Sequence, residues 1–174
     1  MQARGQESPA EYSWVDTPIG RIHVAATHRG LCRVAVGVDE QQFLAKLSQM
    51  GLTPRRSRSG LVNARRELVE YVGGRRREFT LVADLTGISP FQRAVLDATT
   101  TIEFGRSLTY GELARQIGRP RASRAVGNAL GANPIAVVIP CHRVVGAGGR
   151  LGGYAFGAAI KRALMRLEAG QDVT

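Results

Sequence analysis

Hydrophobic and polar residues alternate over the first third of the chain, which is the pattern of strands with one buried face. The two clearest runs are residues 21–26 and 31–36. Each follows a turn signal, Thr-Pro-Ile-Gly at 17–20 and His-Arg-Gly at 28–30. The pattern therefore predicts short antiparallel strands near the N-terminus.

Apolar residues take up helical spacing after these strands. This spacing predicts a helix over residues 39–50 and a second over 61–72, which ends at a Gly-Gly pair. Between the two helices, residues 51–60 are rich in arginine, serine and glycine, so we expect a surface loop there. Residues 79–85 are expected to form one more strand.

Capping signals mark two helices in the second half of the chain. Ser89, followed by proline and by Gln92, predicts the start of a helix that runs to about residue 101. Thr109 and Glu112 form a second capping-box pattern, and the helix that they open is expected to be short.

A further helix is expected after Pro120, with two different faces. Its apolar face is expected to hold Ala122, Ala125, Val126, Ala129 and Leu130, and its polar face Arg121, Arg124 and Asn128. Two short helices, the second basic on its outer side, are typical of a helix-turn-helix, although such pairs also occur as plain packing units. The whole pattern predicts an α+β fold, with a small N-terminal α/β domain (residues 1–84) followed by a mostly helical C-terminal domain (85–174).

Composition narrows the class of protein. The chain has 174 residues, of which 44% are hydrophobic and 22% charged, as in globular proteins. Its longest apolar run, residues 135–139, is far too short to span a membrane, and the first twelve residues show no secretion signal. We therefore expect a cytoplasmic protein with no membrane partner. With only Cys32 and Cys141, a disulfide framework is not expected.

The charge is strongly positive and unevenly distributed. The net charge is +10, and 22 of the 24 basic residues are arginine. Residues 104–166 hold ten basic residues and one acid, so nearly all of the excess lies in the C-terminal third. This distribution indicates a polyanionic partner such as nucleic acid. An arginine-rich solvated surface would have the same composition, so composition alone does not decide between the two.

The most reactive candidate side chain follows an apolar run. Residues 135–139 read as a buried strand, and Pro140-Cys141-His142-Arg143 comes next. A proline can open a helical turn, and a thiol at a helix N-terminus near arginine has a lowered pKa. The alternative is an ordinary small buried cysteine.

Two further residues are candidates for moving the thiol proton. Adjacent side chains do not face each other, so His142 would receive a proton from Cys141 through a water molecule. Glu168 continues the apolar ridge of the last helix one i+4 step beyond Leu164, which would direct its carboxylate inward, towards an imidazole. The pattern is equally compatible with a core histidine and an exposed glutamate.

Several spaced motifs together resemble one family. They are Phe91-Gln92-Arg93-Ala94-Val95, Thr109-Tyr110-Gly111-Glu112-Leu113-Ala114, Arg124-Ala125-Val126-Gly127, Gly131-Ala132-Asn133-Pro134, Pro140-Cys141-His142-Arg143-Val144, Gly153-Tyr154 and Leu167-Glu168. In this order they resemble the O6-alkylguanine-DNA alkyltransferases (methylated-DNA–protein-cysteine methyltransferases). The similarity is close over residues 85–170 and looser before them.

The resemblance implies direct-reversal DNA repair, in which an alkyl group passes irreversibly from guanine O6 to Cys141, once per protein molecule. His142 would accept the thiol proton through water, and Glu168 would orient the histidine. Tyr110 would donate to the leaving guanine and help to rotate the nucleotide out of the duplex. Asn133 would tie the recognition helix to the active-site segment.

The resemblance also implies a mode of DNA binding. The helix-turn-helix would enter the minor groove of double-stranded DNA, with Arg124 filling the space of the flipped base. Arg121 and Asn128 would lie on the same surface, and the small side chains of Ala125 and Gly127 would let the helix approach the DNA closely. The protein is expected to be a monomer that needs no cofactor and no metal, and cooperation between molecules on DNA is left open.

The substrate pocket is where the sequence departs from the family. The resemblance implies a pocket bordered by Val144, Tyr154, Ala155 and Phe156. Relatives often carry a pair of small residues after the tyrosine, whereas this chain has the bulky Phe156 there. The size of alkyl group that the pocket admits is therefore not fixed by the resemblance.

Two other classes of protein share some of these features. A thiol hydrolase or cysteine protease usually takes its base from a distant segment rather than from the next residue. A non-catalytic helix-turn-helix protein that senses alkylated DNA or regulates transcription would have the same basic helix. The presence of Cys141 favours transfer over sensing alone.

Overall fold

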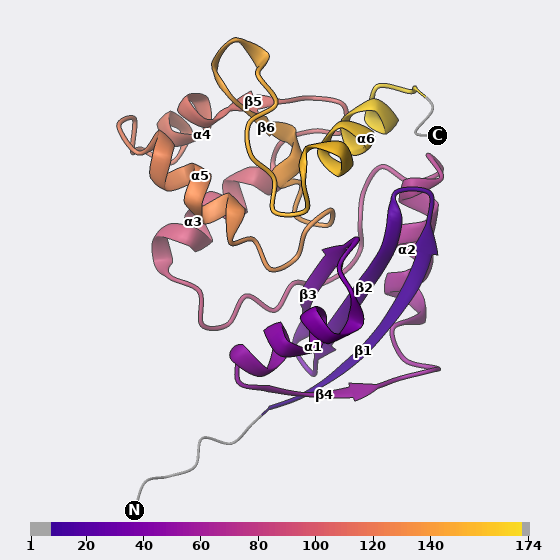
Figure 1. Cartoon of the computed structure of the whole chain (residues 1–174). Helices are drawn as coiled ribbons and strands as arrows, with labels where there is room; N and C mark the ends of the chain where they lie inside the picture. Colours follow the sequence, from indigo (N-terminus) through magenta and orange to yellow (C-terminus); the bar gives the residue numbers. More distant parts are fainter. Residues whose placement is uncertain (1–7, 172–174) are drawn as a thin grey trace, which may run out of the picture.

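A four-stranded sheet forms the N-terminal half of the computed structural model, which describes residues 8–171 (Figure 1). Its strands are β1 (Ser8–Thr17), β2 (Gly20–Thr27), β3 (Gly30–Val36) and β4 (Leu52–Arg56). The strand order is β3-β2-β1-β4, with β1 and β4 parallel and the other pairs antiparallel. The strands predicted over 21–26 and 31–36 are confirmed as the cores of β2 and β3.

Each face of this sheet is covered by one helix. On one face, α1 (Glu40–Gln49) packs Phe43 and Leu47 against the small side chains of the strands. On the other face, α2 (Val62–Val72) packs Leu68 and Tyr71 against Val24 and other β-branched residues. Both helices lie where helical spacing predicted them. Because successive strand residues face opposite sides of the sheet, alternate residues of each strand pack against α1 on one face and against α2 on the other.

Two N-terminal expectations are wrong. Residues 52–56, expected within a loop, form the edge strand β4, which tolerates Pro54 because an edge strand has backbone groups that need no partner. Residues 79–85, expected as a strand, run beside β3 and form a single bridge between Leu31 and Ala83. Residues 79–85 have apolar side chains at every second position and 52–56 do not, yet the second segment pairs and the first makes one bridge, so tertiary contacts rather than alternation decide the pairing.

The C-terminal half contains the helices α3 (Pro90–Thr100), α4 (Tyr110–Gln116) and α5 (Ser123–Gly131), which pack on one another. Both predicted helix starts are confirmed, since Ser89 caps α3 and Thr109 forms a capping box with Glu112. The Gln92 side chain has a different role from the one its position suggested. It donates to the carbonyl oxygens of Ala129 and Ala132 at the end of α5, at 3.3 and 3.0 Å.

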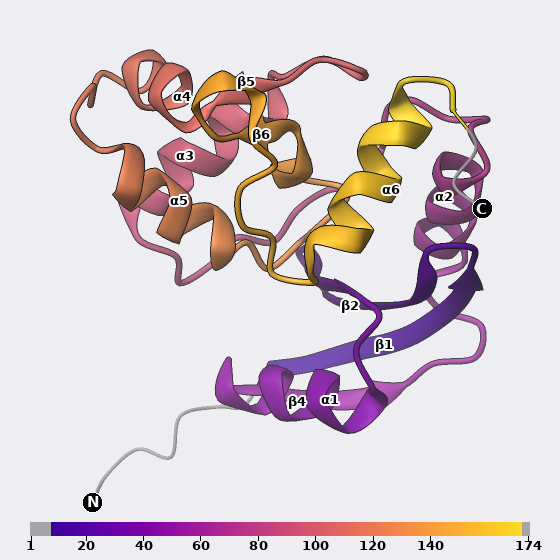
Figure 2. The same ribbon diagram turned by 45° about the horizontal axis from the view of Figure 1, so that its top comes forward.

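The last helix, α6 (Ala158–Glu168), lies between α2 and the other C-terminal helices (Figure 2). A single-turn helix η1 (Cys141–Arg143) precedes the short strand β6 (Val144–Val145), which pairs with β5 (Leu108–Thr109), and a second turn η2 (Ala147–Gly149) follows. One hydrophobic core runs from the sheet through α2 into these helices. The fold is thus α+β, with the sheet in the N-terminal half and helices in the C-terminal half.

The buried strand expected at residues 135–139 is instead a tight turn. Ile135 bridges to Val34 of β3, and Ala136 bridges to Ile139 within the segment. Val137 has a φ of 72°, a left-handed conformation that costs a β-branched residue about 1–3 kcal/mol. The segment is largely buried, as its composition indicates, but apolar composition alone cannot separate a buried strand from a buried turn.

One face of α5 differs from the expectation. Val126, Ala129 and Leu130 are buried, but Ala125, which was expected beside them, is exposed.

None of the helices within residues 8–171 has the length and apolar character needed to cross a membrane.

Candidate active site

Cys141 is the first residue of η1 and is almost completely buried, with 6% of its surface exposed. Its Sγ accepts a hydrogen bond from Asn133 Nδ2 at 3.2 Å. The same amide nitrogen donates to the carbonyl of Ile139 at 3.0 Å, and Asn133 Oδ1 accepts from Ile135 N at 3.0 Å. Asn133 therefore fixes both ends of the turn at 135–139 and the thiol that follows it.

The pKa of Cys141 differs from the expectation. Burial raises the pKa of the thiol, and this effect outweighs the hydrogen bond from Asn133 and the positive charge of Lys161, which act in the opposite direction. The expectation of a lowered pKa is therefore wrong for the free protein. A helical turn of three residues is too short to offset the loss of hydration of a thiolate. Cys141 is protonated at rest.

His142 and Glu168 are directly bonded. His142 Nε2 lies 2.7 Å from Glu168 Oε1, and both side chains are buried. Arg143 donates to the same carboxylate, with Nε 3.0 Å from Oε2 and Nη2 3.0 Å from Oε1. The backbone N–H of Gly105 donates to Oε2 at 2.8 Å. Glu168 thus points inward, which was one of the two possibilities that the sequence allowed.

The protonation states follow from these contacts. Burial alone would raise the pKa of Glu168, but His142, Arg143 and Tyr71 together lower it to about 2. Burial lowers the pKa of His142, and Glu168 offsets only part of this effect. Neutral His142 therefore carries its proton on Nε2, facing the carboxylate. Its Nδ1 is buried and has no hydrogen-bond partner within the described residues, so a lone pair is available there.

Sequence reasoning missed Tyr71, which reaches this site from α2 in the N-terminal half. Its hydroxyl donates a short hydrogen bond to Glu168 Oε1 and lies 3.2 Å from His142 Nε2. The side chain is fully buried, and burial followed by the charge of Glu168 raises its pKa well above 10. Nothing local in the sequence distinguishes Tyr71 from an ordinary core aromatic.

Lys161 was also missed. It is fully buried on α6, and its Nζ donates to the carbonyl oxygens of Val144 and Gly153, at 2.6 and 3.2 Å. Lys161 lies three residues before Leu164 and seven before Glu168, so it shares their buried helical face. That spacing was the available signal, but a lysine is rarely assigned to a core.

Beside the thiol is a cavity of about 260 Å³. Its lining consists of Tyr110, Gly127, Leu130, Gly131, Cys141, Gly153, Tyr154 and Ala155. The hydroxyl of Tyr154 is buried in this region and interacts with the Cys141 thiol, and burial raises its pKa well above 10. The Tyr110 hydroxyl lies 3.5 Å from the Gly153 carbonyl. The cavity therefore combines one thiol with two phenol groups.

Two residues expected at this pocket do not line it. Phe156 packs edge-on against Tyr154, with ring centroids 5.7 Å apart, and so supports the wall from behind. Val144 is fully buried, and its carbonyl accepts from Lys161. The position of Tyr110 depends on Gly152, whose φ is 67° and where an added Cβ would lie 2.8 Å from the Tyr110 hydroxyl oxygen.

The outer face of α5 and the turn before it carry Arg121, Arg124, Ala125 and Asn128, all of them exposed. Gly127 is half-buried and faces Tyr110, whose ring lies 3.7 Å from where a Cβ would be. Small residues therefore separate the basic surface from the cavity. Within residues 8–171, no group of three His, Cys, Asp or Glu side chains is arranged to hold a metal ion.

The fold and the site fit a class of DNA methyltransferases that join a ribonuclease-like domain to a DNA-binding domain. Residues 11–85 match the family model described as "6-O-methylguanine DNA methyltransferase, ribonuclease-like domain". Residues 90–170 match the model of the DNA binding domain of the same methyltransferase. The chain belongs to the O6-methylguanine-DNA methyltransferase family, which includes the methylated-DNA–protein-cysteine methyltransferases.

Individual relatives cover nearly the whole chain. It is 44% identical over 159 residues to the methylated-DNA–protein-cysteine methyltransferase of Mycolicibacterium paratuberculosis. The alignment covers 91% of this chain and 92% of that relative. The crystal structure of Mycobacterium tuberculosis OGT in complex with DNA superposes with a TM-score of 0.79 at 40% identity, over 92% of this chain and 93% of the other.

The chain is also 36% identical over 170 residues to the bifunctional transcriptional activator and DNA repair enzyme Ada of Escherichia coli. That match covers 97% of this chain but only 48% of Ada. The chain therefore spans about half the length of that relative.

Replacing Glu168 with glutamine is expected to destabilise the protein by about 3 kcal/mol at pH 7, because Arg143 would lose its buried counter-charge. The folded-state pKa of about 2 lies below the ordinary value of 4.5, so this stability is present above pH 4.5. It is lost as the pH falls from 4.5 towards 2.

Urea denaturation of wild type and Glu168→Gln across this pH range measures the effect. The difference between the two proteins should shrink as the pH falls. Glu103→Gln, at an exposed carboxylate, is the control and should show little change. A constant difference at all pH values would contradict the assigned ion pair.

Proposed function

We propose that this chain repairs DNA by irreversible transfer of an alkyl group from O6 of guanine to Sγ of Cys141. The observation that carries the proposal is the cavity of about 260 Å³, in which Cys141 is the lining residue with a nucleophilic side chain. This volume is just below the ~300–1,000 Å³ of pockets for drug-sized ligands, which suits a single base with a small alkyl group. Family membership and the relatives named above support the same activity.

The chemistry follows from the protonation states. The thiol proton passes to His142 Nδ1 through a bridging water, since the two adjacent side chains do not bond directly. The resulting thiolate attacks the alkyl carbon, the S–C bond forms and the C–O6 bond breaks. Guanine leaves with its bonding electrons and takes a proton from Tyr110. The Tyr110 phenolate then takes up a proton from solvent, and the His142 imidazolium ion releases the former thiol proton to solvent. A thioether has no easy leaving route, so the protein acts once.

Glu168 and Tyr71 act on this step through His142. The carboxylate holds the proton of His142 on Nε2 and stabilises the positive charge that develops when Nδ1 is protonated. Tyr71 donates to the carboxylate and fixes its orientation. Tyr71 is therefore a positioning residue, and it gives the N-terminal half (residues 1–84) a part in a reaction carried out by residues 85–174.

DNA binding is assigned to α4 and α5 acting as a helix-turn-helix in the minor groove of double-stranded DNA. The exposed arginines of α5 and its preceding turn supply positive charge, and the small Ala125 and Gly127 allow close approach. The lesion carbon cannot be reached in a stacked duplex, so the nucleotide must flip into the cavity, with Arg124 filling the gap. The unit that acts is a monomer. A sensor that binds alkylated DNA without transfer would not need the thiol in this cavity.

Mixing the protein with a duplex that contains O6-methylguanine should add the mass of one methyl group per protein molecule. Cys141→Ala should abolish this gain and still bind DNA. Cys32→Ala is the matched control, because Cys32 is buried away from the cavity and its burial raises its pKa to about 11. Intact mass spectrometry measures both, and methyl transfer by Cys141→Ala would overturn the proposal.

Replacing Tyr71 with phenylalanine should slow transfer at acidic pH, on the acid limb of the pH–rate profile. Without this donor, Glu168 bonds His142 more strongly, the pKa of His142 rises, and less of the base is neutral. The acid limb of the pH–rate profile should therefore move to higher pH. Tyr12→Phe is the control, since its hydroxyl bonds Glu40 at 2.8 Å, outside the site. An unchanged profile for Tyr71→Phe would remove its assigned role.

Replacing Arg124 with alanine should strongly slow repair of duplex DNA and leave the reaction with free O6-methylguanine base almost unchanged. In the wild type, Arg124 would offset the free energy needed to unstack one base, which is on the order of a few kcal/mol. Rates on both substrates at two salt concentrations test this, with Arg121→Ala as the neighbouring control. Rescue by low salt would show that Arg124 is only a phosphate contact. Equal losses on both substrates would place its role in the fold or the pocket.

A further inference from the structure

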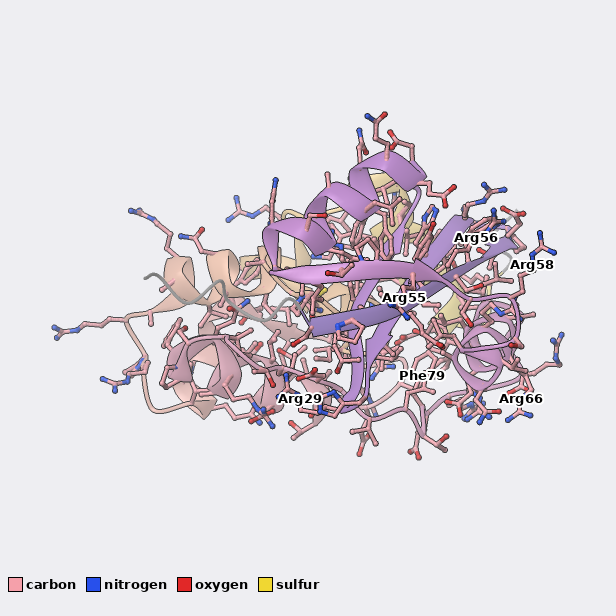
Figure 3. All side chains as sticks on the ribbon, turned by 90° about the horizontal axis from the view of Figure 1, so that it is seen from below. Arg29, Arg55, Arg56, Arg58, Arg66 and Phe79 are labelled. Atoms are coloured by element: carbon pink, nitrogen blue, oxygen red, sulfur yellow. The ribbon has the colours of Figure 1, made fainter. Side chains whose placement is uncertain are left out.

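A second small cavity lies on the N-terminal half, where β4 ends beside α2. Its volume is about 220 Å³, several times the ~30 Å³ that a water molecule occupies in the liquid. It is lined by Ser13, Trp14, Arg56, Ser57, Arg58 and Arg65. Figure 3 shows Arg56 and Arg58 at this end of the sheet, with Arg55 and Arg66 on the same side of the molecule. No step of the alkyl transfer uses these residues.

The backbone around the cavity is held by hydrogen bonds. Ser57 N donates to the carbonyl of Tyr12 at 2.9 Å, which continues the pairing of β4 with β1 by one residue. Gly60 N donates to Ser57 Oγ at 2.8 Å, so this oxygen acts as an acceptor and its own hydrogen is available for a ligand. The Arg56 guanidinium lies 4.1 Å from the centre of the Trp14 ring, a cation–π contact that orders it.

The cavity has positive charge that the protein does not neutralise. Its lining includes three arginines and no carboxylate. Within residues 8–171, Arg56, Arg58 and Arg65 form no ion pair, and Arg65 Nε is buried without an acceptor. Since a buried donor is normally satisfied, this N–H indicates an acceptor from outside the chain.

Two of the three nearby acids are engaged elsewhere. Glu40 accepts from the Tyr12 hydroxyl at 2.8 Å, and Asp16 pairs with Arg21 at 2.8 Å. Glu11 lies opposite Arg55 in the pairing of β1 with β4 but forms no ion pair within the described part of the chain, and its carboxylate lies against Gly60, next to Ser57 at the edge of the cavity. Other arginines of this face have their own partners; for example, Arg29 pairs with Asp84 at 3.3 Å. Three arginines that form no ion pair among the described residues, Arg56, Arg58 and Arg65, thus meet at this cavity.

We propose that this cavity binds a phosphate group, either free phosphate or a phosphate of a nucleic-acid backbone. Arginine guanidinium groups bind phosphate through paired N–H donors, and a serine hydroxyl adds a further donor. The exposed Arg55 and Arg66 extend the positive surface beyond the cavity, as a backbone with successive phosphates requires. The elements that carry its lining, β1, the end of β4 and α2, lie away from α4 and α5 in both ribbon views, so its ligand is not the base-flipped segment of DNA (Figures 1 and 2).

The chain provides its own reporter for this site. Trp14 is the single tryptophan of the sequence, and it lines the cavity under Arg56. Titration of the full-length protein with inorganic phosphate should change its tryptophan fluorescence to saturation, whereas sodium chloride of equal ionic strength should not. Arg58→Gln and Arg65→Gln should each weaken phosphate binding at least tenfold.

Arg66→Gln is the matched control for this experiment. Arg66 is next to Arg65 on α2 but pairs with Glu70 at 3.8 Å and does not line the cavity. Phosphate affinity should be little changed in this variant. Equal losses in Arg58→Gln and Arg66→Gln, or a wild-type response no greater than that to sodium chloride, would overturn the proposal. Arg58 is exposed, so Arg58→Gln tests the site without threatening the fold.

An undamaged duplex distinguishes the two sources of phosphate. The duplex is added to the Arg124→Ala variant, in which the α5 interface is weakened, and tryptophan fluorescence is measured as before. A saturable response that Arg58→Gln abolishes assigns the cavity to a nucleic-acid backbone, and a response to inorganic phosphate alone assigns it to free phosphate. The reaction of Arg58→Gln with free O6-methylguanine base should equal that of wild type in either case, because the free base has no backbone phosphate, so this test is independent of the alkyl-transfer chemistry.

Discussion

The carboxylate of Glu168 is the contact on which the rest of the site depends. An ionised group in the core is tolerated only when hydrogen bonds and charge replace its hydration. Here the donors come from different parts of the chain, namely Tyr71 of α2, His142 and Arg143 of η1, and the backbone of Gly105. The carboxylate thereby joins the N-terminal half to the reactive segment. Correct docking of α2 is a condition for a correctly oriented histidine.

The charges around this carboxylate also explain how the thiol is kept inactive until it is needed. Burial raises the pKa of Cys141, and His142 is neutral with a free lone pair on Nδ1. The site therefore stores a base and a thiol rather than a thiolate and an imidazolium ion. Because the thiolate is the nucleophile, a protonated resting cysteine reacts slowly with stray electrophiles. For a protein that acts once, this restraint preserves the thiol for the lesion.

The sequence predicted those parts of the fold that depend on local signals. Capping boxes and apolar spacing placed α1 to α5, and alternation placed β2 and β3, because these patterns are written within a few neighbouring residues. The edge strand β4 and the turn at Val137 were not predictable in this way. The first forms because β1 offers an open edge, and the second because Asn133 and β3 impose a strained backbone on an apolar run.

The same division holds for the site. Adjacency identified Cys141 and His142 as candidates, and helical spacing left Glu168 either inward or exposed, of which the structure shows the inward position. Tyr71 could not be inferred, because it lies 71 residues away in sequence from His142 and its hydroxyl is distinguished only by what it touches. The lowered thiol pKa was expected from a helix N-terminus, but burial of the whole residue was the larger effect. Burial of Cys141 by residues distant in sequence, rather than its local position in a helical turn, thus decides the protonation state of the thiol.

The helix that is assigned to DNA is connected to the thiol by side chains at its C-terminal end. The last carbonyl groups of a helix lack partners within it, and in α5 those of Ala129 and Ala132 are bound by Gln92 of α3. Directly after α5, Asn133 holds the turn at 135–139 and the sulfur of Cys141. Because polar contacts fix both steps, α5 cannot shift without moving the thiol. Under the proposed function, a base brought in by this helix would meet Cys141 in a geometry that Gln92 and Asn133 set before any step of the reaction begins.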